Sequence, residues 1–107
     1  MCRESGHAAN SLAVIEEVVR LSEAMQHASL LSDWGEVARL AAARHPLLMS
    51  IRADQPPQAL ALIRRIQQLT EAIGHEAQVA RDELTAEYQA FLNQTAGARA
   101  YLSGARL

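Results

Sequence analysis

A stripe of apolar residues recurs every three or four positions through most of the second half of the chain. It spans 29 residues in eight steps, a mean of 3.6 residues per step, through Leu62, Ile66, Leu69, Ile73, Ala77, Ala80, Leu84, Tyr88 and Phe91. This period is that of an α-helix, because a β-strand would alternate every second residue. The stripe predicts a long helix from about residue 58 to residue 95, which Gly97 is expected to end or bend.

Two shorter helices are predicted before the stripe. The first begins with Asn10 or Ser11 as its cap and runs to about Leu31. The second begins at the sequence Asp-Trp-Gly-Glu over residues 33–36, which has the form of a capping box. In that motif Asp33 caps the helix and Glu36 reaches back to the cap residue.

The second helix is expected to continue to Ile51. Pro46 lies inside its pattern, removes one backbone hydrogen bond and is expected to kink it. Pro56 and Pro57 then predict a turn that leads into the long helix.

The resulting fold class is all-α, an antiparallel three-helix bundle with a long third helix and a short fourth helix over residues 98–107. Connections of a few residues place sequential helices side by side. A chain of 107 residues suits one helical domain, residues 1–107, with residues 1–9 frayed.

Composition and charge narrow the function classes. The chain is 50% hydrophobic but only 4% aromatic, and its net charge is −2, which argues against a nucleic-acid binder with a basic stripe. No apolar run approaches the roughly 20 residues of a transmembrane helix, so we expect no membrane insertion. We find no signal peptide pattern and expect a cytoplasmic protein.

No motif points to catalysis. The sequence contains no phosphate-binding glycine loop, nucleophile elbow or zinc-protease signature. Two weak metal-ligand pairs, Glu71 with His75 and Cys2 with His7, lack further ligands nearby and are better explained as solvated side chains. We therefore predict no catalytic, cofactor or metal site, and no enzyme.

Surplus hydrophobicity is the more informative signal. The end of the second helix and the start of the third carry more large apolar residues than one small core needs. They are Leu47, Leu48, Ile51, Leu60, Ile63, Ile66, Leu69 and Ile73. These residues predict a groove for an amphipathic partner helix, unless the fourth helix or a second copy of the chain covers them.

Four stretches in order resemble the FliT family of flagellar export chaperones. The family's Gly-Asp-Trp junction is similar to residues 31–34, with Ser32 in place of the glycine. Its "L…R..LL" pattern resembles Leu40 through Arg44 to residues 47–48, where Pro46 is a departure. The proline-containing loop leading to the apolar positions 63, 66, 69 and 73, and an Ala-Tyr pair at residues 100–101, complete the likeness. It covers residues 12–102, although the tail is shorter than usual.

The resemblance implies a function and a set of partners. FliT-like proteins bind the C-terminal region of the filament-cap protein FliD, keep it unassembled and deliver it to the type III export apparatus. Some members also bind the export ATPase complex, the export gate or the flagellar master regulator. In the family the last helix can cover the binding surface, and Tyr101 and Leu102 occupy the matching positions here.

Two alternatives stay open. The first is a chaperone for another secretion substrate, such as a hook–filament junction or injectisome protein. The second is a helical dimerisation or scaffold module, a homodimer whose groove is its own interface.

Overall fold

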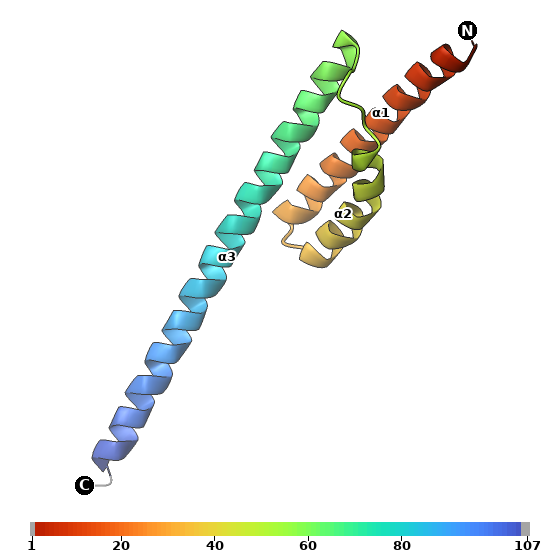
Figure 1. Cartoon of the computed structure of the whole chain (residues 1–107). Coiled ribbons are helices and arrows are strands. Elements are labelled where there is room, and N and C mark those ends of the chain that lie inside the picture. Colours follow the sequence, from red (N-terminus) through yellow and green to blue (C-terminus); the bar gives the residue numbers. More distant parts are fainter. Residues whose placement is uncertain (1, 106–107) are drawn as a thin grey trace. The chain divides into compact units, whose positions relative to one another are not determined.

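The computed structural model describes residues 2–105, and these residues form three α-helices and no strand (Figure 1). Helix α1 is Cys2–Leu30, α2 is Trp34–Met49 and α3 is Pro57–Ala105. The predicted all-α class is confirmed. None of the described helices is both long enough and apolar enough to span a bilayer.

The chain divides into two compact units, Met1–Glu76 and Ala77–Leu107. The first unit contains α1, α2 and the first part of α3. The second contains the rest of α3. The expectation of one domain over residues 1–107 stays a prediction.

The core of the first unit is shared by its three helical segments. Its larger cluster joins α1 to the start of α3 through the buried residues Ile15, Val18, Val19, Ala59 and Ile66. A smaller cluster takes one buried residue from each helix, namely Met25, Leu40 and Ile73. The apolar faces read from the sequence are therefore the faces that pack, because burying them removes the most apolar surface from water.

The corner between α1 and α2, which can be followed in Figure 1, has the hydrogen bonds of a Schellman motif. The backbone N–H of Asp33 donates to the carbonyl of Ala28 at 2.9 Å, and the N–H of Ser32 donates to the carbonyl of Ser29 at 3.0 Å. These two bonds satisfy carbonyls at the end of α1 that have no partner within the helix. The motif needs a left-handed residue, and Ser32 supplies it with φ of 57°. This is the position where the FliT-like pattern has glycine, which adopts that conformation without steric cost.

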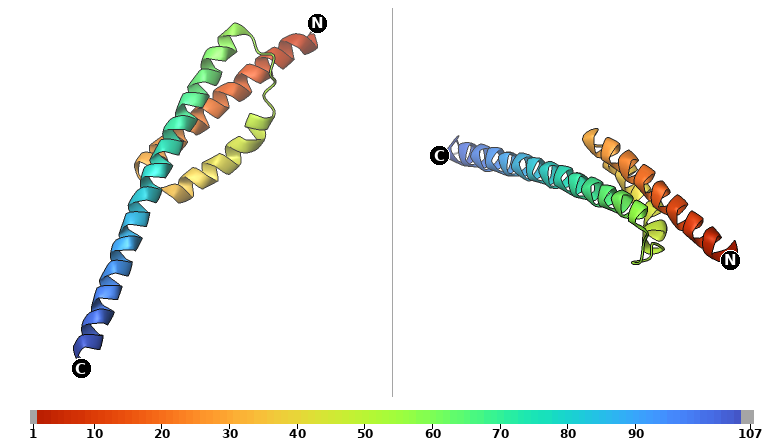
Figure 2. Two further views of the ribbon diagram at one scale, coloured as in Figure 1. Left: turned by 60° about the vertical axis from the view of Figure 1, so that its left-hand side comes forward. Right: turned by 90° about the horizontal axis from the view of Figure 1, so that it is seen from above.

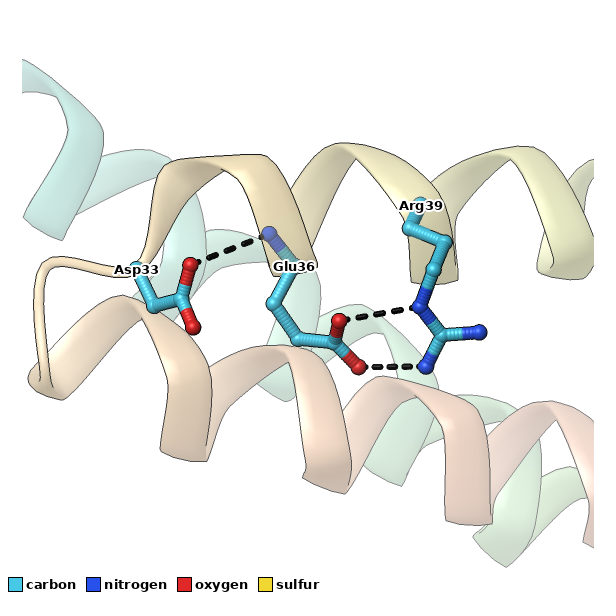
Figure 3. A network of polar contacts seen from close by, with 3 residues as sticks. All are labelled: Asp33, Glu36 and Arg39. Atoms are coloured by element: carbon cyan, nitrogen blue, oxygen red, sulfur yellow. Dashed lines mark hydrogen bonds and ion pairs between the residues drawn. The ribbon is translucent and has the colours of Figure 1, made fainter.

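Asp33 caps α2, as the sequence predicted (Figure 3). Its carboxylate accepts a hydrogen bond from the backbone N–H of Glu36 at 3.2 Å. The second contact of the predicted capping box, from the Glu36 side chain back to Asp33, is wrong. The N–H of Asp33 already donates to the carbonyl of Ala28. The Glu36 carboxylate instead accepts two hydrogen bonds from Arg39, one of them from Nε at 2.9 Å. The hydrogen bond and charge of Arg39 hold the pKa of Glu36 below its ordinary value.

Helix α2 ends two residues earlier than predicted, at Met49. Ser50 caps it with both its backbone N–H and its hydroxyl, which donate to the carbonyl of Leu47. Pro46 lies inside the helix without ending it, and its missing N–H leaves the carbonyl of the exposed residue Ala42 without a helical donor. The predicted kink stays a prediction. Residues 50–56 form a non-helical connection to α3 (Figure 2).

The structure corrects two predicted helix ends. Helix α1 begins at Cys2 and not at Asn10 or Ser11, which lie inside it. Helix α3 continues through Gly97 to Ala105, so the predicted separate fourth helix is wrong. A glycine inside a helix costs only about 1 kcal/mol relative to alanine. The alanines at positions 96, 98 and 100 favour continuation.

Replacing Ser32 by glycine is expected to stabilise the protein. A non-glycine residue in the left-handed region pays about 1–2 kcal/mol, whereas glycine pays about 0.5–1 kcal/mol of extra chain entropy. Ser32→Gly should therefore raise the free energy of unfolding by roughly 0.5–1 kcal/mol. Urea unfolding followed by circular dichroism measures this. In the control Ala43→Gly, an exposed helical site, the free energy should fall by about 1 kcal/mol. A loss of stability in both variants would contradict the interpretation of the corner.

Removing the Asp33 cap is expected to destabilise the first unit. Asp33→Ala should lower the free energy of unfolding by about 1 kcal/mol, because the N–H of Glu36 loses its acceptor. Asp33→Asn keeps an acceptor and should retain most of the stability. Asp54→Ala, in the exposed connection, serves as the control and should change stability by less than about 0.5 kcal/mol. Equal losses in the two alanine variants would show that the cap contributes nothing specific.

Candidate functional site

Three of the eight residues predicted to line a partner groove lie in the core. Ile66, Leu69 and Ile73 are only 5%, 1% and 8% exposed. Ile66 belongs to the cluster shared with α1, and Ile73 packs with Met25 and Leu40. Their side chains are used by the fold itself and are not open to a partner in this conformation.

The other five predicted groove residues remain accessible to different degrees. Leu47, Leu48, Ile51 and Ile63 are partly buried and pack against the edge of the larger core cluster. Leu60 is 45% exposed. These five residues, which we call the apolar rim, come from the end of α2, the connection after it and the start of α3. Their role in partner binding stays a prediction.

An open depression lies beside the apolar rim. Its volume is about 480 Å³, and it is lined by Leu48, Ile66, Gln67, Thr70 and Glu71. Its walls thus come from α2 and the first part of α3. They combine apolar side chains with an amide, a hydroxyl and a carboxylate, a mixture also found in the lining of ligand pockets.

Arg44 holds the three helical segments of the first unit together by hydrogen bonds. Its Nη1 donates to Ser22 Oγ on α1 at 3.0 Å and to Thr70 Oγ1 on α3 at 3.2 Å. Thr70 also lines the depression, so Arg44 fixes one of its walls. Partial burial lowers the pKa of Arg44 from its ordinary value, although an arginine stays charged at any physiological pH.

Apart from its place in the FliT-like pattern, no sequence feature singled out Arg44. The ion pairs among the described side chains are Glu17 with Arg20 and Glu36 with Arg39, both on exposed faces. Ser22 is fully buried and occupies an apolar position of α1. In the sequence, the sign of this contact was a serine at a position of α1 where its neighbours in the stripe are apolar. A buried hydroxyl needs a polar partner, and here that partner is Arg44.

Tyr101 and Leu102 lie near the end of α3, within the second unit. Their side chains are 76% and 60% exposed. Since no separate fourth helix exists in the described residues, these side chains are part of one long helix here. Their predicted covering role stays a prediction.

No metal site is found among the side chains that the structure describes. No three His, Cys, Asp or Glu residues lie close enough there to hold an ion. Glu71 and His75 are both exposed. The side chains of Cys2 and His7 lie outside the described part of the chain.

Removing Arg44 is expected to cost stability through Ser22. Arg44→Met leaves the buried Ser22 hydroxyl without this donor and should lower the free energy of unfolding by about 1–3 kcal/mol. Ser22→Ala in the same chain should recover much of that loss, since both polar partners are then gone. A double-mutant cycle by urea unfolding measures the coupling between the two residues. Purely additive losses would show that the bond contributes nothing.

Comparison with known proteins gives a family match. The sequence model of the family described as "Flagellar protein FliT" matches residues 12–103, which is most of the chain. No curated protein and no solved structure gives a significant match. The family match spans the Schellman corner, the Asp33 cap, Arg44 and the apolar rim, and on that basis the chain belongs to the flagellar protein FliT family.

Proposed function

We propose that the chain is a flagellar export chaperone that binds the C-terminal region of the filament-cap protein FliD. The family match over residues 12–103 is the observation that carries this proposal. In this role the protein holds FliD unassembled in the cytoplasm and delivers it to the type III export apparatus. The ATPase complex and the export gate are its further proposed partners, together with the flagellar master regulator.

The first unit offers the physical means for such binding. We propose that its helices form an antiparallel bundle, which leaves the apolar rim and the depression on one side. An amphipathic cargo helix can bury its apolar face on a surface of this kind. Leu60, at 45% exposure, is the member of the rim most open to such contact. Covering apolar residues of FliD would also prevent their assembly before export.

We propose that Tyr101 and Leu102 regulate access to the cargo surface. Each large apolar side chain contributes about 1.5–3 kcal/mol when it becomes buried. Two such side chains suffice for a weak contact that cargo displaces. Their high exposure in the described helix leaves them free to form it.

The alternatives differ in cargo or in class. A chaperone for another secretion substrate would use the same surface with a different partner helix. A scaffold module would use its apolar surface only for self-association, and it would not bind FliD.

Calorimetric titration with the FliD C-terminal segment of the same organism tests the proposal. The folded full chain should bind the segment. Leu60→Glu should weaken binding at least about tenfold, since burying a leucine is worth that factor or more. Gln68→Glu adds the same charge at an exposed position of the same helix and should leave the affinity unchanged.

A truncation after Thr95 tests the regulatory role. Removing Tyr101 and Leu102 should tighten binding if they limit access to the surface. Tight and unchanged binding would keep the chaperone and discard the regulation. Absence of binding by either folded form would overturn the FliD assignment.

A further inference from the structure

Arg44 is the arginine that the fold takes partly out of water. Its side chain is half-buried, whereas the other arginines whose side chains the structure describes are exposed. Burial lowers the pKa of Arg44, and no acidic group acts against this effect. The ion pairs of the described side chains belong to Arg20 and Arg39, so no carboxylate of that part of the chain pairs with Arg44. A charge held in this way without a counter-charge costs free energy.

The two hydrogen bonds of Arg44 use one nitrogen only. Nη1 donates to Ser22 Oγ and to Thr70 Oγ1, whereas Nε and Nη2 have no acceptor among the described residues. The N–H groups of these two nitrogens point from the same edge of the planar guanidinium. Their spacing matches the two oxygens of a carboxylate. Arg44 therefore has an unused edge that fits an acidic group.

Arg39, on the same helix, shows what this edge binds (Figure 3). Its Nε and Nη2 donate to the two carboxylate oxygens of Glu36, the residue three positions before it. Arg44 has no such neighbour on α2. The positions three and four residues before and after it are apolar, namely Leu40, Ala41, Leu47 and Leu48. An acid that pairs with Arg44 must therefore come from outside α2.

We propose that Arg44 binds the carboxylate of an acidic side chain on the cargo helix and thereby determines which helices the surface accepts. This inference rests on the proposed chaperone function, because it concerns the same surface. Arg44 lies one turn from Leu48 on α2 and donates to Thr70 on α3, and both of these residues line the depression. Leu48 also belongs to the apolar rim. A cargo helix that covers the rim thus reaches Arg44 with an acid about one turn beyond its apolar anchors.

Glu71 restricts where the acid of the cargo can lie. Its carboxylate lines the same depression, next to Thr70 in the sequence, and its side chain is exposed. Among the described side chains it forms no ion pair with Arg44. A cargo helix over the depression excludes water, which strengthens both the attraction to Arg44 and the repulsion from Glu71. The acid of the cargo therefore lies on the α2 side, and a basic or amide side chain suits the α3 side.

Calorimetric titration with the FliD C-terminal segment measures the contribution of the guanidinium. The compared chains are Ser22→Ala and the double variant Ser22→Ala with Arg44→Met, since the double variant leaves no buried hydroxyl unpaired and should stay folded. Loss of Arg44 should weaken binding at least about tenfold, the factor expected for a hydrogen bond between charged groups. Arg65→Met removes the same charge from an exposed position on the face of α3 opposite Gln67 and should leave the affinity unchanged.

Variants of the segment identify the acid that pairs with Arg44. Each Asp or Glu is replaced in turn by Asn or Gln, which keeps the shape and removes the charge. One replacement should weaken binding to Ser22→Ala by the same factor and have no effect on binding to the double variant. Equal affinity of both chains, or no acid coupled to Arg44, would overturn this inference and leave the chaperone function standing. No binding by the unchanged, folded chain would overturn both.

Discussion

The packing of one face of α3 against α1 decides what the rest of the first unit can do. Ile66, Leu69 and Ile73 are almost fully buried, and this face closes the core over α1 and α2. Each such side chain contributes about 1.5–3 kcal/mol when it leaves water, so the fold cannot give up this face cheaply. The apolar rim and the depression next to it are what remains accessible, and they are the surface that we propose for partner binding.

The corner between α1 and α2 sets up that packing. Three residues without helical structure connect the two helices, and Asp33 serves both of them: its N–H closes the end of α1 and its side chain caps α2. Arg44 then adds a polar tie from α2 to both neighbouring segments, through Ser22 and Thr70. Thr70, in the wall of the depression, is therefore tied to α2 by an exposed hydrogen bond as well as by the apolar contacts around it.

Sequence reasoning succeeded where local rules decide the structure. In the first unit the helical periodicity identified the faces that pack, whereas the end of the same stripe, at Leu84, Tyr88 and Phe91, is exposed. The Asp33 cap was readable because its chemistry needs only the next three residues. It failed where a group had two possible partners. Glu36 pairs with Arg39 because a bond from Asp33 to Ala28 removed its expected target. Gly97 was expected to end or bend a helix that in fact continues through its alanine neighbours.

Periodicity shows that a face is apolar but not what covers it, so it could not separate core from rim in α3. The role of Arg44 depends on residues 22 and 26 positions away, which no local pattern reveals.

We propose that cargo binds to the surface that the core of the first unit leaves accessible. Hydrogen exchange of the full chain, measured with and without the FliD C-terminal segment, tests this most directly because it locates the contact without any substitution. We expect bound FliD to slow amide exchange at the end of α2 and the start of α3, around Leu48, Ile51 and Leu60. Slowing confined to residues 77–105, or no slowing in a mixture that binds, would contradict it.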